Sequence, residues 1–229
     1  VDLHAITVDH DAAGLRRQVH DTVSILLAAG IDPQRSLLFR QSDVAEHAYL
    51  CWLLANVTSF GELRRMHQFK EKSEQQREFV SAGLFFYPVL QAADILAYQT
   101  DEVPVGEDQK QHIEMARTVA ERFNSRFGNV FTVPHHRIPE VGARILDLQD
   151  PEKKMSTTGG SDQGTVFILD QPDAIARKFK SAVTDSGNEI RRAPDKRGIS
   201  NLIEIMAVAR GITPEDVEAE YASDPGYAR

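Results

Sequence analysis

The 229-residue chain is 41% hydrophobic and carries a net charge of −8, enough apolar material for one large domain or two small ones. It has no apolar run of about 18 residues and no signal-peptide pattern at its start, so we expect a cytoplasmic protein without a membrane partner. The single Cys51 cannot form an internal disulfide and is expected to be a small core residue. The acidic balance argues against a protein that coats nucleic acid, such as a general DNA binder.

Two groups of basic residues could nevertheless form local patches that hold a phosphate backbone. On their own they are better explained as solvated helix faces. The first group is Arg64, Arg65, Lys70 and Lys72, and the second is Arg177, Lys178, Lys180, Arg191 and Arg192.

The first third of the chain is predicted to be mainly helical. Residues 3–7 resemble a strand end, and residues 36–40 a short strand. Residues 44–60 predict a mostly apolar, buried helix, and the basic residues 62–77 a helical or mobile segment. Residues 11–29 predict an amphipathic helix. Its apolar face is formed by Leu15, Val19, Val23 and Leu26, and Gly30 lies where a C-terminal cap is expected.

Strand and helix signals alternate through the middle of the chain. Pro88 suits the first turn of a helix that continues to about Tyr98. Residues 130–133 and 143–148 are strand candidates, and residues 154–164 are rich in loop-forming residues.

Three helices are then expected, starting near Pro172, Asn201 and Pro214. Strands that alternate with helices, followed by helices alone, predict an α/β sheet domain with a helical appendage.

The stretch from Val103 to His112 is typical of a nucleotide-binding corner. A short apolar segment with Val103 and Val105 meets Gly106, and Asp108 can cap the helix that follows. Free N–H groups at such a helix start can bind an anion. Alone, this pattern is equally compatible with a structural strand-turn-helix corner.

Several motifs in the same order resemble the class I aminoacyl-tRNA synthetases, and among them the bacterial tryptophanyl-tRNA synthetases. The resemblance runs from Val1 to Tyr227. It is carried by the run from Tyr87 to Leu96, the run from Val103 to His112, and the loop Lys153-Lys154-Met155-Ser156-Thr157-Thr158-Gly159-Gly160, which is similar to the Lys-Met-Ser-Lys-Ser loop of that class.

The resemblance implies a Rossmann-type nucleotide-binding parallel sheet with a helical insertion and a C-terminal helical domain. Residues 1–167 would form the catalytic domain, with residues 8–81 as a helical insertion used for dimerisation, and residues 168–229 would begin the domain that binds the tRNA anticodon. The sequence starts after the family's Thr-x-Gly-Asn signature and stops early in the last domain, so we expect omitted segments at both ends.

The pattern Tyr87, Gln91 and Asp94 places three side chains on one helix face. Without the resemblance, a capping Tyr, a surface Gln and a salt-bridged Asp explain it. The resemblance implies that Asp94 accepts the indole N–H of tryptophan, and that Tyr87 and Gln109 hold its amino group. The remaining pocket wall would be His4, Gln91, Val103 and Val105; many bacterial relatives have Met at the position of Gln91.

The resemblance also implies an ATP site, with Mg²⁺ on the phosphates and Lys154 and Ser156 as catalytic residues. Thr157 stands where the family has a second Lys. Three alternatives follow: Lys154 suffices, another cation such as Lys72 contributes, or the loop is catalytically weakened. The implied ATP contacts are Gly106, Glu107, Asp108, Gln109, Ile145, Lys154, Met155, Ser156, Thr157, Thr158 and Lys72.

The implied activity is that of a homodimeric tryptophan–tRNA ligase, which joins L-tryptophan to tRNA(Trp) through tryptophanyl-adenylate. The alternatives are a tyrosyl-tRNA synthetase and a weakly catalytic paralogue that binds tryptophan or tRNA. His112, His135 and His136 lack the spacing and the cysteines of a zinc site, so we expect no metal ligands in the protein.

Overall fold

The computed structural model describes residues 1–66, 80–142, 144–156 and 160–223. The chain divides into two compact units, Val1–Arg137 and Ile138–Arg229. Within the described ranges, no helix is both long enough and apolar enough to cross a membrane.

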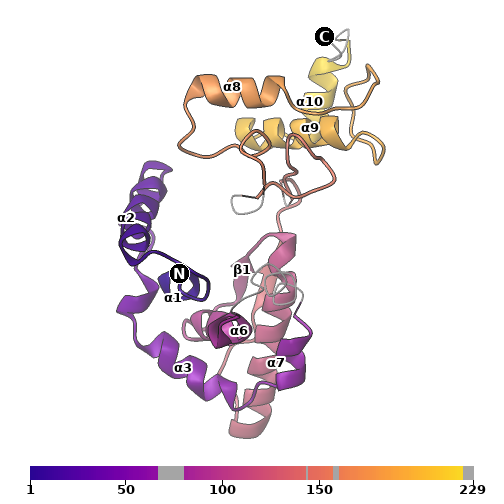
Figure 1. Ribbon diagram of the computed structural model, residues 1–229. Helices are drawn as coiled ribbons and strands as arrows, with labels where there is room; N and C mark the ends of the chain where they lie inside the picture. The colour runs from indigo at the N-terminus through magenta and orange to yellow at the C-terminus, as the bar shows by residue number, and fades with distance from the viewer. Residues whose placement is uncertain (67–79, 143, 157–159, 224–229) are drawn as a thin grey trace. The chain divides into compact units, whose positions relative to one another are not determined.

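The first unit begins with helices of unequal length, of which α2 is the longest (Figure 1). The predicted helix 11–29 is confirmed as α2, where Asp11 accepts hydrogen bonds from the backbone of Gly14 and Ala13, and Gly30 adopts a φ of +104° after the last turn. The elements are α1 (Asp2–Ala5), α2 (Ala12–Ala28), η1 (Gln41–Asp43), α3 (Glu46–Ala55) and α4 (Phe60–Arg64).

Neither early strand is formed. Residues 3–7 belong to α1 and the turn after it, because the Leu3 N–H donates to Gln41 Oε1 at 3.0 Å instead of to a neighbouring strand. Residues 36–40 have no regular structure, and the Phe39 ring packs on the rings of His47 and Tyr98. Tertiary contacts therefore replace a ladder in both segments.

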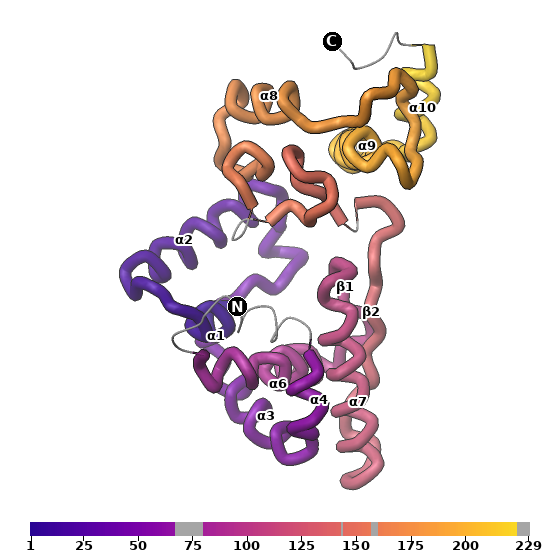
Figure 2. Tube along the Cα trace, turned by 45° about the vertical axis from the view of Figure 1, so that its right-hand side comes forward, coloured from indigo at the N-terminus to yellow at the C-terminus, as the bar shows by residue number. Residues whose placement is uncertain are grey.

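The rest of the first unit is a strand-helix-strand arrangement preceded by a long helix. β1 and β2 are parallel, with Glu102 opposite His135, and α7 connects them and packs on β2 (Figure 2). This confirms the predicted α/β class with a parallel sheet. The elements are α6 (Ala82–Leu96), β1 (Glu102–Pro104), η2 (Glu107–Gln109), α7 (Lys110–Phe127) and β2 (His135–Arg137).

The prediction that Pro88 starts a helix is wrong. α6 begins at Ala82, where the Ser81 side chain caps it by accepting from the Leu84 N–H at 3.0 Å. Pro88 lies buried in the helix interior, where its missing N–H cannot bond the Leu84 carbonyl.

The strand predicted at 130–133 is also wrong, because side-chain amides occupy the backbone groups that a ladder would use. Asn124 accepts from the N–H groups of Val130 and Phe131, and Gln99 accepts from the Thr132 N–H at 2.8 Å. The strand forms a few residues later, as β2.

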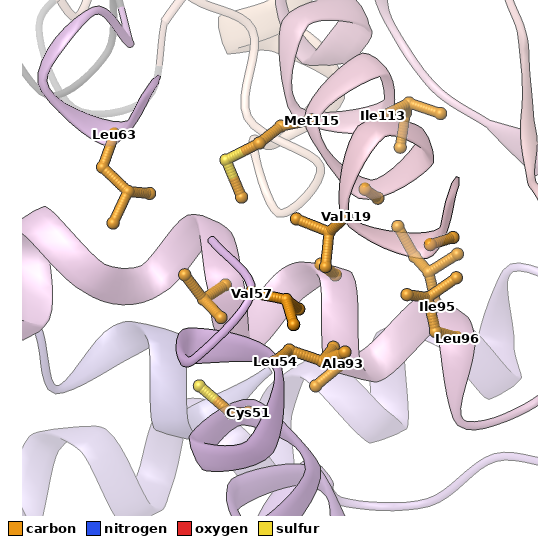
Figure 3. Packing of buried hydrophobic residues seen from close by; sticks show 14 of the residues in the cluster. Cys51, Leu54, Val57, Leu63, Ala93, Ile95, Leu96, Ile113, Met115 and Val119 are labelled. Carbon is orange, nitrogen blue, oxygen red and sulfur yellow. The ribbon is translucent and has the colours of Figure 1, made fainter. Parts of the chain in front are cut away.

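The core of the first unit lies between α3, α6 and α7 (Figure 3). The predicted helix at 44–60 is shorter and less buried than expected, since α3 ends at Ala55 and exposes Tyr49 and Trp52 on its outer side. Cys51 is buried as expected, and burial together with the charge of Asp94 raises the pKa of its thiol to about 11. The residues labelled in Figure 3 are Cys51, Leu54, Val57, Leu63, Ala93, Ile95, Leu96, Ile113, Met115 and Val119.

The second unit is helical around a small core of its own. The three predicted helices are confirmed as α8 (Pro172–Lys180), α9 (Arg197–Arg210) and α10 (Pro214–Tyr221), although α9 begins four residues before Asn201. Of the strand predicted at 143–148, residue 143 lies outside the described residues, and residues 144–148 form a single antiparallel bridge, between Leu146 and Lys154.

A partly buried ion pair links α4 to α7. Arg122 donates to both oxygens of Glu62, at 2.6 and 3.0 Å, and to the Val57 carbonyl. The hydrogen bond from Arg122 holds the pKa of Glu62 below its usual value. We expect Arg122→Met to lower the free energy of unfolding at pH 7 by about 1–3 kcal/mol.

A carboxyl group whose pKa is lower in the folded than in the unfolded chain stabilises the fold at pH values above its unfolded pKa, which is about 4.3 for Glu. This contribution disappears as the pH falls through the folded pKa. The difference between wild type and Arg122→Met should therefore shrink below about pH 4, measured by urea denaturation. Arg126→Met, on the exposed end of the same helix, is the control. A difference that does not depend on pH would contradict the assignment.

Candidate active site

The Asp94 carboxylate on α6 lies where four elements of the first unit meet. His4 from α1 donates to Asp94 Oδ2 at 3.0 Å, and Gln41 from η1 donates to the same oxygen at 2.8 Å. His47 from α3 places Nδ1 3.8 Å from the other oxygen, Oδ1. Asp94 Oδ1 is buried and has no hydrogen-bond partner among the described residues.

Tyr87 stands two turns before Asp94 on α6, on the same face of the helix, and is buried. Its hydroxyl is 2.9 Å from His112 Nε2, with the two rings stacked, and the His4 ring meets it edge-on at 5.9 Å. Burial raises the pKa of Tyr87 to about 12, so the hydroxyl stays neutral. A hydroxyl that donates to imidazole presents its oxygen as an acceptor, which suits an ammonium group.

A cavity of about 330 Å³ opens beside Tyr87. Its walls come from α1, α3 and α6, and they are mainly apolar. The size is within the range of pockets for small organic ligands. The lining residues are Leu3, Ile6, Thr7, Ala48, Cys51, Ser81, Gly83, Phe86, Tyr87 and Leu90.

A second polar chain connects α6 to the corner after β1. Gln91 donates to Gln109 Oε1 at 3.4 Å, and Gln109 donates to Asp108 Oδ2 at 3.1 Å. The prediction that Asp108 caps the following helix is wrong, because residues 107–109 form the turn η2 and α7 starts after Gln109 without a side-chain cap. Glu107 and Asp108 are exposed instead.

The structure brings the predicted tryptophan residues of the first unit together in two groups. His4 contacts both Asp94 and Tyr87, and Gln91 contacts Gln109. Val103 and Val105 are half-buried and pack against the main core. Gly106 has an extended backbone that any residue can adopt, so its predicted approach to a ligand stays a prediction.

In the second unit, the predicted ATP residues also lie together. The Met155 N–H donates to the Ile145 carbonyl at 2.9 Å, and Lys154, which is exposed, forms the bridge with Leu146. The Ser156 carbonyl accepts from the Gly160 N–H and the Thr165 hydroxyl. Lys72, Thr157 and Thr158 lie outside the described residues.

Two buried side chains that the sequence did not suggest support this loop. Asn201 accepts from the Leu146 N–H at 2.7 Å and donates to its carbonyl at 2.9 Å, so α9 fixes the strand-like segment. Asp147 accepts from the N–H groups of Gln149 and Asp150. A Cβ on Gly164 would lie 1.9 Å from the Asp147 carboxylate, so only glycine fits there.

Three of the five residues in the basic group of the second unit pair with acidic side chains. Lys178 is buried and pairs with Asp170 at 2.7 Å, and Arg191 pairs with Glu189. Arg192 contacts three glutamates on α9 and α10, namely Glu204, Glu215 and Glu218. These side chains serve the fold of the unit.

The three histidines that invited a metal interpretation have other contacts. His112 contacts Tyr87, His135 accepts from Arg117, and His136 donates to Glu114 at 3.1 Å. In the part of the chain that the structure describes, no group of three or more His, Cys, Asp or Glu could hold a metal ion.

Comparison with known proteins gives a consistent result. The sequence model of the family of class I tRNA synthetases for tryptophan and tyrosine matches residues 1–226 of this chain. Tryptophan–tRNA ligase 2 of Streptomyces avermitilis is 53% identical over 229 residues, which cover 99% of this chain and 68% of that protein.

Solved structures agree with this match. Tryptophanyl-tRNA synthetase from Mycoplasma pneumoniae superposes with a TM-score of 0.89 at 37% identity, covering 99% of this chain and 70% of its own. The Campylobacter jejuni enzyme, solved in complex with ADP and tryptophan, gives 0.73 at 34% identity, covering 98% of this chain and 68% of its own. The chain therefore has the Rossmann-like fold of this class, and it belongs to the family of class I tRNA synthetases for tryptophan and tyrosine.

Proposed function

We propose that the chain carries the tryptophan-activating site of a tryptophan–tRNA ligase, which uses ATP to make tryptophanyl-adenylate and transfers tryptophan to tRNA(Trp). Relatives with this name match nearly the whole chain at about half identity, from 49% to 53%. These relatives favour tryptophan over tyrosine as the substrate.

The observation that carries the residue assignment is the environment of Asp94. A buried carboxylate oxygen without a donor costs free energy, commonly about 1–3 kcal/mol. Asp94 Oδ1 is such an oxygen in the described residues, and the other oxygen of this carboxylate bonds to His4, whose ring meets Tyr87 edge-on. An indole N–H would supply the missing donor, whereas a tyrosine side chain offers a hydroxyl with a different position and shape.

The chemistry requires alignment more than acid–base catalysis. The tryptophan carboxylate attacks the α-phosphorus of ATP, a carboxylate–phosphate bond forms, and pyrophosphate leaves with the electron pair of the broken P–O bond. The nucleophile is already anionic, so no general base is needed. The Tyr87 oxygen and the Gln109 side chain would orient the ammonium group.

Lys154 would stabilise the negative charge on the phosphates, and Ser156 would add a hydroxyl contact. The backbone pairing of Met155 with Ile145 supports the loop that presents them. We expect Mg²⁺ to be held mainly by phosphate oxygens, since this ion keeps few protein ligands in such sites. The adenosine contacts of Gly106, Glu107 and Asp108 remain part of the proposal.

The weakly catalytic paralogue is the competing function, motivated by Thr157 in the place of a lysine. Tryptophan-dependent exchange of pyrophosphate into ATP by the complete polypeptide separates the two. We expect exchange with tryptophan and little with tyrosine. Binding of tryptophan without exchange would favour the paralogue.

We also propose a cytoplasmic homodimer in which residues 8–81 supply the interface. The outer sides of α3 and α4 carry large exposed apolar side chains, with Tyr49 at 69%, Trp52 at 67% and Phe60 at 68% exposure. A symmetric pair would bury this patch on both copies.

Asp94→Asn tests the indole contact. Asparagine keeps the shape but removes the charge-assisted acceptor, so we expect the KM for tryptophan to rise roughly ten- to a hundredfold in the exchange assay. The KM for ATP should change little. Unchanged KM and kcat for tryptophan would remove Asp94 from the pocket.

Lys154→Ala tests the phosphate loop, with the adjacent Lys153→Ala as a matched control because Lys153 pairs with Asp150. A cation that acts on phosphate charge in the transition state should lower kcat for exchange much more than it changes tryptophan binding. Full activity in Lys154→Ala would show that the loop assignment is wrong.

Thr157→Lys restores the family's second lysine. We expect faster adenylate formation or no change, measured by single-turnover kinetics. Loss of activity in this variant would mean that the loop works in a different geometry here.

The dimer is tested with Trp52→Glu. A charge in the centre of a buried apolar interface is strongly unfavourable, so the variant should be monomeric at micromolar concentration while the wild type is dimeric, as measured by light scattering. Leu169→Glu in the second unit, at a side chain that is 69% exposed, is a control outside residues 8–81. A monomeric wild type would rule out the proposed interface.

A further inference from the structure

The two oxygens of Asp94 have unequal surroundings. Oδ2 accepts two hydrogen bonds, from His4 Nε2 at 3.0 Å and from Gln41 Nε2 at 2.8 Å. Oδ1 is buried and accepts none from the described residues. The hydrogen bonds to Oδ2 therefore hold the carboxylate in one orientation, in which Oδ1 is the oxygen that still lacks a donor.

The orientation of the Gln41 side-chain amide is fixed by its two partners. It is 4% exposed, and its Oε1 accepts from the Leu3 N–H at 3.0 Å. If the amide were flipped, its oxygen would face the Asp94 carboxylate and its NH₂ would face the Leu3 N–H, which are two repulsive contacts. The network thus fixes the Nε2 donor toward Asp94.

The backbone of Gln41 is anchored as well. Its carbonyl accepts from His47 Nδ1 at 3.1 Å, and His47 Nε2 lies 2.8 Å from the Tyr98 hydroxyl. The neutral tautomer with a proton on Nδ1 satisfies both contacts, with Tyr98 as the second donor. Hydrogen bonds therefore connect Tyr98, just after α6, to His47, His47 to Gln41, and Gln41 to Asp94.

His4 shares the contact with Oδ2 but has a different character. Its side chain is 20% exposed and belongs to the four-residue helix α1. Gln41 is more deeply buried, and an amide does not titrate. Gln41 is therefore the more deeply buried of the two donors to Oδ2.

We propose that Gln41 is a positioning residue that determines specificity: by holding Asp94 Oδ2, it leaves Oδ1 as the single acceptor for the indole N–H. The inference rests on the proposed function, because it assumes that Asp94 binds tryptophan. Gln41 then acts on the amino acid only through Asp94.

The test compares tryptophan with β-(3-benzothienyl)alanine, in which sulfur replaces the indole N–H at nearly the same shape. Pyrophosphate exchange is measured with both amino acids for wild type and for Gln41→Met. We expect the preference for tryptophan, as the ratio of kcat/KM values, to fall about tenfold or more in the variant. The loss should come from the KM for tryptophan, with kcat and the KM for ATP nearly unchanged.

Gln99→Met is a matched control. Gln99 also bonds with both ends of its amide, to the Val130 carbonyl at 3.1 Å and the Thr132 N–H at 2.8 Å, but these partners are far along the chain from Asp94. This variant should lose stability without changing the preference between the two amino acids.

Gln41→Glu is a second variant for the case in which Gln41→Met does not fold. It keeps an oxygen for the Leu3 N–H, and it replaces the donor to Asp94 with a second acidic group, whose negative charge the Asp94 carboxylate repels. A reduced preference at neutral pH is expected here too. A wild-type preference in Gln41→Glu would overturn the inference, as would an equal rise in KM for both amino acids in Gln41→Met.

The failures of the two proposals are distinguishable. If wild type shows no tryptophan-dependent exchange, the proposed function is wrong, and the inference falls with it. If wild type exchanges both amino acids equally well, Asp94 does not read the indole N–H. If wild type prefers tryptophan and Gln41→Met retains that preference, only the role of Gln41 is wrong.

Discussion

The hydrogen bonding around the Asp94 carboxylate organises the candidate site. Donors from α1 and η1 converge on one of its oxygens, and His47 from α3 lies beside the other. Because these elements are far apart in sequence, the carboxylate also fixes how α1 and η1 meet α6. A single buried acceptor oxygen remains, and on the same helix a neutral Tyr87 lines a cavity of about 330 Å³. Shape, a polar anchor for the amino group and one directed acceptor are together what recognition of an aromatic amino acid with a ring N–H requires.

The fold could be predicted where local signals and tertiary contacts agree. Asp11 and Gly30 bracket α2, and Pro172 and Pro214 mark the starts of α8 and α10. The prediction failed where side chains compete for the backbone. The amides of Asn124 and Gln99 take the hydrogen-bonding groups of residues 130–132, and Gln41 takes the Leu3 N–H, so β-like sequences do not become strands. Propensity gives no indication of such long-range contacts.

The candidate site shows the same division. Helical spacing predicts that Tyr87 and Asp94 share a face, and the family motifs suggest Gln109 and Lys154. Gln41 and His47 were not predicted, because neither belongs to a motif and Gln41 lies 53 positions from Asp94. Asn201 was missed for the same reason: its two bonds to Leu146 span 55 positions. The residues that contact a ligand can be suggested by pattern, whereas those that hold them in place depend on the folded chain.

The central claim is that Asp94 Oδ1 accepts the indole N–H of bound tryptophan. The most direct measurement is the proton resonance of the indole N–H of ¹⁵N-labelled tryptophan bound to the protein, since a hydrogen bond to a carboxylate moves this resonance downfield. We predict a downfield shift on binding to wild type that is largely lost in Asp94→Asn and reduced in Gln41→Met. The account would be contradicted if tryptophan binds to wild type without a downfield shift of its indole N–H resonance, or if the shift is the same in Asp94→Asn.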